Sequence, residues 1–70
     1  MKRHVGKLTE EEFRVLRAAS HGLWGREIDI FETLNPPGRA NTVMQSIRRK
    51  LGAKNTAHAV AIGLREGKIN

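Results

Sequence analysis

Apolar side chains recur every three or four positions along four stretches of the chain, which is the spacing of amphipathic helices. The first stretch carries a strong helix-start signal. Thr9 stands where an N-cap is expected, and Glu12, three residues later, completes a capping box. We therefore predict a helix over residues 10–20, with Leu16 on its inner side and Gly22 just beyond its end.

The second stretch predicts a short helix over residues 25–33. Its inner stripe is expected at Trp24, Ile28, Phe31 and Leu34. Trp24 and Gly25 stand where a capping Ser or Asp would be expected, so this helix begins without a side-chain cap of its own. Trp24 has two interpretations, a core-edge residue at the junction of the first two helices or an anchor for a partner protein.

The third stretch, residues 36–51, follows the turn Asn35-Pro36-Pro37-Gly38, in which Asn35 can act as N-cap and Pro36 as the first helical residue. A narrow inner stripe is expected at Ala40, Val43, Ile47 and Leu51, with Met44 at its edge. The opposite face carries Thr42, Gln45 and Arg49, flanked by Asn41, Arg48 and Ser46.

The fourth stretch predicts a helix over residues 55–65, capped by Asn55 or Thr56 and carrying Val60 and Leu64 on its inner stripe. Because no stretch shows the alternation of a strand, the sequence predicts an all-α fold, a compact four-helix helix-turn-helix domain over residues 8–70. Residues 1–7 are expected to form a flexible basic tail.

Charge is distributed very unevenly. Thirteen Lys and Arg against seven Asp and Glu give a net charge of +6 over 70 residues. Six of the seven acids precede residue 33, whereas six basic residues and no acid lie between Thr33 and Arg65. This asymmetry favours a polyanionic partner, and nucleic acid is the usual one. An anionic membrane surface is a weaker alternative, because residues 36–52 contain no aromatic side chain to insert.

Composition also argues against several classes of function. The chain has no cysteine, and His4 and His21 have no other metal-ligating residues beside them, so no metal or other cofactor is expected. Ser20 and Ser46 lack an evident base, which predicts that the protein is not an enzyme and has no small-molecule substrate. No membrane-length apolar run or signal peptide is evident, so we expect a cytoplasmic protein.

The outward face of the third helix suits double-stranded DNA. Asn and Gln can pair with adenine, Arg with guanine, and Thr can contact a thymine methyl group. This helix offers that set from one side in Asn41, Thr42, Gln45, Arg48 and Arg49. The alternative is an ordinary polar surface, although such surfaces more often carry Glu–Lys pairs.

Phosphate contacts are expected beside that face. Arg39, Lys50 and Lys54 suit such contacts, which fix register without reading sequence. The backbone amides around Gly38, at the start of the helix, are a second phosphate anchor.

A short helix, a tight turn and a second helix with a basic outer face are the parts of a helix-turn-helix reader. The residues resemble the LuxR-type signature, also called GerE- or NarL-type, over about residues 8–68. The resemblance rests on Leu8-Thr9, Glu12, Val15-Leu16, Gly22, Glu27-Ile28, Ile47, Lys50-Leu51-Gly52 and Ala59-Val60. It implies a four-helix DNA-binding domain whose third helix enters the major groove, and it makes Arg39 and Asn41 base-contact candidates.

The chain departs from this pattern in three places. Trp24-Gly25 replaces a small polar cap, Asp29 replaces an alanine, and one residue is inserted near Asn35-Pro36-Pro37. The resemblance also implies that the fourth helix often forms a dimer contact. His58, Ala59 and Ile62 could line such a seam or form a solvent-exposed stripe, and the sequence leaves both interpretations open.

Two functional hypotheses follow from the sequence. The first is a sequence-specific transcription regulator that binds DNA as a homodimer. The second is a protein-interaction module that docks on RNA polymerase, a sigma factor or another regulator through Trp24, Phe31 and the Pro36-Pro37 corner.

Overall fold

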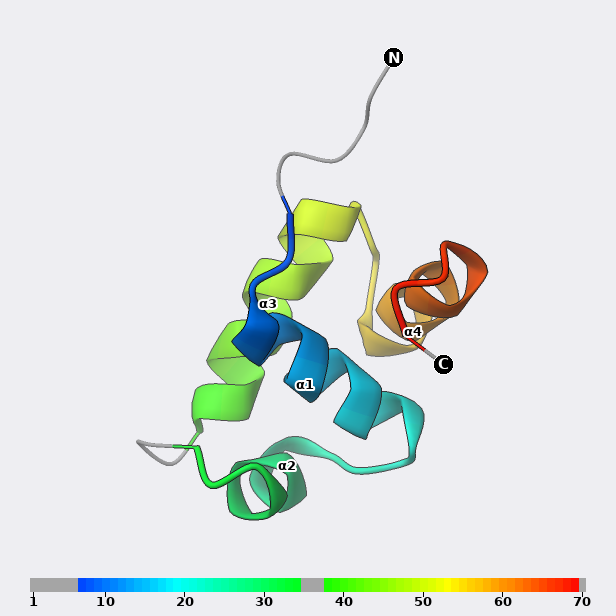
Figure 1. Ribbon diagram of the computed structural model, residues 1–70. Helices are drawn as coiled ribbons and strands as arrows, with labels where there is room; N and C mark the ends of the chain where they lie inside the picture. Colours follow the sequence, from blue (N-terminus) through cyan, green and yellow to red (C-terminus); the bar gives the residue numbers. More distant parts are fainter. Residues whose placement is uncertain (1–6, 35–37, 70) are drawn as a thin grey trace.

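The computed structural model describes residues 7–34 and 38–69. Four helices follow one another along the chain: α1 (Glu10–Ser20), α2 (Gly25–Phe31), α3 (Arg39–Leu51) and α4 (Thr56–Arg65). Helix α1 packs against each of the other three, and α3 contacts both α2 and α4 (Figure 1). The predicted compact all-α fold with four helices is confirmed. The conformation of the α2–α3 connection at residues 35–37 lies outside the described part, and the helix-turn-helix arrangement stays a prediction.

Helix α1 begins as the sequence predicts. The Thr9 hydroxyl accepts the Glu12 N–H at 3.1 Å, and the Glu12 carboxylate accepts the Thr9 N–H at 2.7 Å, so the capping box is complete. Glu10 and Glu11 share this first turn, where negative charge suits the positive end of the helix dipole.

Helix α2 is two residues shorter than expected, ending at Phe31 rather than Thr33. Thr33 takes a positive φ of 52°, which stops the helix and lets the Leu34 N–H bond back to the Asp29 carbonyl at 2.8 Å. At the other end, the Glu27 carboxylate accepts the Trp24 N–H at 2.9 Å. The missing N-cap side chain is therefore partly replaced from within the first turn.

Helix α3 starts at Arg39, three residues later than the predicted start at Pro36. Gly38 is its N-cap, with a left-handed φ of 88° that favours glycine. Because the helix starts after Gly38, the prediction of Asn35 as N-cap and Pro36 as first helical residue was wrong about the start of the helix. Both residues themselves lie outside the described residues.

The inner stripe of α3 is confirmed. Its buried side chains are Ala40, Val43, Met44, Ile47 and Leu51. They join a core completed by Leu8, Val15, Leu16, Ala18, Ile28, Ala59 and Ile69. Burial of this stripe fixes the rotation of α3, so its opposite face is turned to solvent.

Three expected core positions are wrong. Trp24 is 65% exposed, Phe31 is 70% exposed and Leu64 is 49% exposed. In α2 only Ile28 and Asp29 are buried, because seven residues make too few turns to bury an entire stripe.

Helix α4 turns Ala59 and Gly63 inward instead of Leu64. A Cβ at Gly63 would lie 3.0 Å from Leu16 and 3.2 Å from Ile69, so a larger residue would have to displace these side chains by a few tenths of an ångström. The chain reverses after the helix, with the Lys68 N–H donating to the Gly63 carbonyl at 2.8 Å. Ile69 thereby enters the core.

None of the helices in the described part of the chain is both long and apolar enough to cross a bilayer.

Candidate nucleic-acid interface

The outward face of α3 is open to solvent along three helical turns. Asn41, Thr42, Gln45 and Arg49 are exposed, and Arg48 is half-buried at the edge of the face. We call these five residues the outer face of α3. Their donors and acceptors point away from the core, because the buried stripe occupies the other side of the helix.

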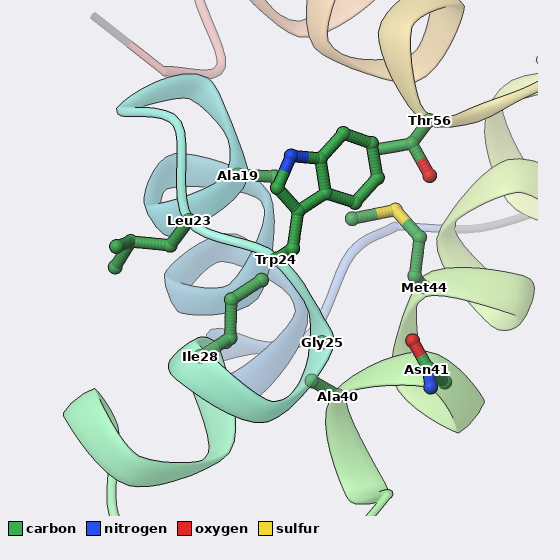
Figure 2. Close-up of a pocket in the computed structure, with 9 residues that line it drawn as sticks. All are labelled: Ala19, Leu23, Trp24, Gly25, Ile28, Ala40, Asn41, Met44 and Thr56. Carbon is green, nitrogen blue, oxygen red and sulfur yellow. The ribbon is translucent and has the colours of Figure 1, made fainter.

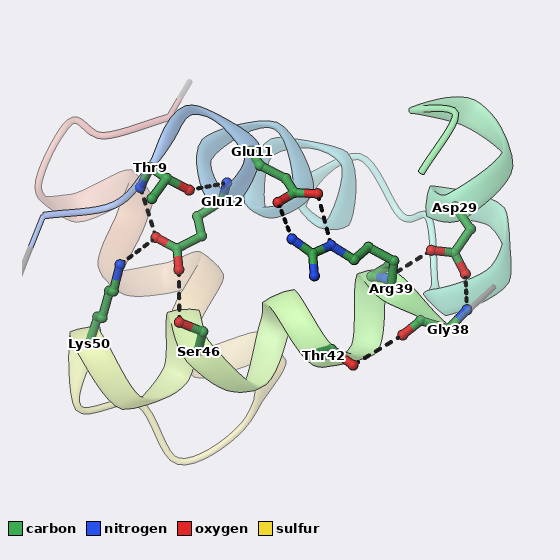
Figure 3. Close-up of polar contacts among 10 residues, drawn as sticks. Thr9, Glu11, Glu12, Asp29, Gly38, Arg39, Thr42, Ser46 and Lys50 are labelled. Carbon is green, nitrogen blue, oxygen red and sulfur yellow. Dashed lines mark hydrogen bonds and ion pairs between the residues drawn. The ribbon is translucent and has the colours of Figure 1, made fainter. Parts of the chain in front are cut away.

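The edge of α3 that faces α1 is engaged within the protein (Figure 3). The Glu12 carboxylate lies between the two helices and is 7% exposed. It accepts a hydrogen bond from Lys50 Nζ at 2.9 Å on Oε1 and one from Ser46 Oγ at 2.8 Å on Oε2. Together with the Thr9 N–H, these donors satisfy the buried carboxylate.

This cluster sets the protonation of Glu12. Burial by itself would raise the pKa of the Glu12 carboxyl, but the hydrogen bonds from Lys50, the Thr9 N–H and Ser46 outweigh it. They hold the pKa below its usual value of 4.5, and the carboxyl stays ionised at neutral pH.

A second ion pair ties the start of α3 to α1. Arg39 donates to the two Glu11 oxygens from Nε at 3.1 Å and from Nη2 at 2.7 Å. The fork lowers the pKa of the Glu11 carboxyl, chiefly through the hydrogen bond from Arg39. Both side chains are partly exposed, so solvent screens the pair.

Asp29 supplies the cap that α3 lacks in its own sequence. Its Oδ2 accepts the Gly38 N–H and its Oδ1 accepts the Ala40 N–H, each at 2.8 Å (Figure 3). Gly38 has no side chain for capping, and the first turn of α3 has no acidic residue. The nearly buried carboxylate of α2 therefore satisfies amides that would otherwise be unpaired and complements the dipole of α3.

These contacts correct part of the predicted DNA site. The Gly38 amide cannot anchor a phosphate while it donates to Asp29, whose negative charge would also repel one. Lys50 is engaged by Glu12 and by the Lys7 carbonyl, and Arg39 is engaged by Glu11. Each cation is partly exposed, but its positive charge is already matched by a carboxylate of α1, which weakens its attraction for a phosphate.

The remaining predicted residues stay accessible. On the outer face of α3 the Thr42 hydroxyl donates a long hydrogen bond to the Gly38 carbonyl at 3.5 Å, and the face stays exposed. Lys54 follows the helix with an exposed side chain. The candidate interface thus consists of polar side chains on α3 and the cations Arg48, Arg49 and Lys54, with no acidic residue in the sequence between Thr33 and Arg65.

Trp24 lies at the border of this surface. It lines a hollow of about 40 Å³ between the start of α2 and the side of α3, together with Asn41, Met44 and Thr56 (Figure 2). The indole reaches across toward Met44 and Thr56 and is largely exposed. The interpretation as a core-edge residue fails on this exposure, and the role as a partner anchor stays a prediction.

The three residues of the expected dimer seam on α4 differ in burial. Ala59 is buried, whereas His58 and Ile62 are half-buried, and Ile62 packs partly against the core. The Nδ1 of His58 accepts the Lys54 N–H at 3.0 Å. The homodimer stays a prediction.

No group of three His, Asp or Glu side chains within residues 7–34 and 38–69 is placed to hold a metal ion. Comparison with known proteins gave no match to a family model, to a curated protein or to a solved structure.

Proposed function

We propose that the chain is a transcription regulator that binds double-stranded DNA sequence-specifically, with α3 in the major groove. The observation that carries the proposal is the outer face of α3, a solvent-exposed surface with amide, hydroxyl and guanidinium groups and no acid. An α-helix fits the major groove, and these groups match the hydrogen-bonding edges of its bases. The net charge of +6 and the resemblance to LuxR-type domains support the same proposal.

The internal ion pairs limit the number of phosphate contacts. If the charges of Arg48, Arg49 and Lys54 displace counterions from the duplex while Arg39 and Lys50 stay bound to α1, log affinity should fall with log salt at a slope of about −3 per protomer. Release of both cations onto DNA would steepen the slope to about −5. Fluorescence anisotropy with a labelled duplex across a salt series measures it, and a slope near zero would rule out this interface.

Substitutions can distinguish residues that contact bases from residues that contact phosphates. Gln45→Ala should cost about 1–3 kcal/mol on a duplex selected by the protein from a random pool, and much less on unrelated duplexes. Lys54→Ala should weaken binding equally on both and make the salt slope shallower by about one. Equal losses for Gln45→Ala on both duplexes would make this residue a phosphate contact and would leave sequence reading without its central residue.

The second candidate is the protein-interaction module, docking on RNA polymerase, a sigma factor or another regulator. The exposure of Trp24 and Phe31 favours this candidate. The two side chains line separate hollows, however, and do not form a single docking surface. Absence of duplex binding at low salt, together with recovery of a protein partner that Trp24→Ala no longer binds, would favour this module over DNA binding.

A further inference from the structure

A groove runs between α1 and the end of α2. It encloses about 350 Å³ and is lined by Arg14, Arg17, Ala18, His21, Phe31 and Glu32. Arg14, Arg17 and His21 follow one another at helical spacing, on the side of α1 away from its buried positions Val15 and Leu16. The groove is therefore bordered by a basic ridge on α1.

The opposite border carries Phe31 and Glu32. Phe31 is 70% exposed at the end of α2, and so is Ile30, which precedes it in the helix but does not line the groove. The exposed aromatic ring gives the groove an apolar contact point opposite the basic ridge. Ala18, buried at 4% exposure, contributes a small side chain to the lining between the borders.

Cationic charge on the basic ridge is only partly neutralised. Arg14 lies 3.6 Å from a Glu32 oxygen and 3.7 Å from a Glu10 oxygen. Arg17 is exposed and forms no ion pair with any of the described residues. A ligand with negative charge along one edge could therefore pair with Arg17. A DNA duplex would fit less well, because its phosphates would also approach Glu10 and Glu32.

We propose that this groove docks an amphipathic helix of another protein, with acidic residues along one edge of its apolar stripe. From Arg14 to His21 the ridge spans about 10 Å, the length of two turns of such a helix. The apolar stripe would cover Phe31, and the acidic edge would meet Arg17. Helices commonly bind protein grooves through apolar anchors at this spacing.

This inference does not depend on DNA binding. The basic ridge lies on the side of α1 away from Val15 and Leu16, and the outer face of α3 lies on the side of α3 away from its buried stripe. The two helices pack against each other (Figure 1). The protein can thus hold a duplex and a partner helix at the same time. A DNA-bound regulator would gain in this way a surface for recruiting a second protein.

A display selection tests the proposal with the full chain as bait. The probe is a library of random peptides of about 16 residues, long enough to form a helix on binding. The enriched peptides should carry Leu, Ile or Phe at helical spacing with Asp or Glu beside them. Their affinity should fall at least about tenfold with Phe31→Ala and with Arg17→Glu.

Matched controls exist on α4. Leu64→Ala removes another exposed apolar side chain, and Arg65→Glu reverses another exposed cation. Both should leave peptide affinity unchanged, and a saturating duplex should not compete with the peptide. All four substitutions are at exposed positions, so thermal unfolding should show that each variant folds like the wild type.

Several outcomes would overturn the proposal. One is a selection in which no enriched peptide loses affinity for the Phe31→Ala and Arg17→Glu variants. Another is enrichment of basic instead of acidic peptides. Self-association that Phe31→Ala abolishes in sedimentation would assign the groove to a second copy of the chain. A loss of duplex binding in Arg17→Glu as large as in Arg49→Glu would assign it to nucleic acid.

Discussion

Glu12→Ala is expected to lower the free energy of unfolding by about 2–4 kcal/mol, the largest effect of any single polar substitution that we predict. Removal of this carboxylate leaves Ser46 and the Thr9 N–H without their acceptor and leaves Lys50 with only the Lys7 carbonyl. Lys50 is only 26% exposed, so its ammonium loses its partner where water can only partly replace it. Urea unfolding should show a lower midpoint with an unchanged slope.

Glu10→Ala is the matched control, because Glu10 lies in the same turn with its side chain 87% exposed. Its effect should stay within about 0.5 kcal/mol. An equal effect of both substitutions would mean that the helix dipole, and not the Glu12 cluster, accounts for the stabilisation.

Acid should weaken the same cluster. The pKa of Glu12 is lowered in the folded protein, so its contribution to stability is complete above the unfolded value near 4.5 and is lost as the pH falls through the folded value. Glu11, whose pKa is also lowered, adds a loss of the same sign. Glu12→Ala should therefore lose less stability than the wild type between neutral pH and the acid range. An identical pH dependence in both proteins would contradict the assignment.

Asp29→Ala is expected to cost about 1.5–3 kcal/mol of stability, because it leaves the Gly38 and Ala40 amides at the start of α3 without their acceptor. Asp29→Asn keeps one acceptor oxygen and should cost roughly half as much. Hydrogen exchange should quicken first at the amides of Gly38 and Ala40. Unchanged exchange there, with loss of protection elsewhere, would show that Asp29 does not cap α3.

Much of the fold follows from local signals. Thr9 and Glu12 are three residues apart and cap α1 whatever surrounds them. The inner stripe of α3 follows from helical spacing alone, and so does the outer face opposite it. Helix boundaries were less predictable at α3, where Asn35 and Pro36 gave a good start signal but Gly38 takes the N-cap position.

Contacts between helices could not be predicted in the same way. Glu11 and Glu12 suit the dipole of α1 by position, yet both also bind cations of α3, because α1 and α3 pack along that edge. In the sequence Asp29 is notable only as a departure from the LuxR-type pattern. Its role as a cap of α3 depends on α2 and α3 lying side by side. Arg39, Lys50 and Gly38, which the sequence predicts as DNA contacts, thus have internal partners that the sequence did not indicate.

Burial on the short helices also escaped sequence reasoning. Trp24, Phe31 and Leu64 have helical spacing and apolar side chains but point outward. On α4 the buried position is Gly63, and Ile69 packs over it because the chain reverses after the helix. A glycine in a helix is normally a weak position, so nothing local indicated that a distant isoleucine would cover it.

Amide chemical-shift mapping tests most directly whether a duplex contacts the outer face of α3. A duplex selected from a random pool, titrated into labelled protein, should shift the amides from Asn41 to Arg49 and at Lys54. The amides of Arg17 and His21 should stay in place. Shifts confined to the groove of α1 and α2, or an unperturbed α3 at a saturating duplex concentration, would contradict the account.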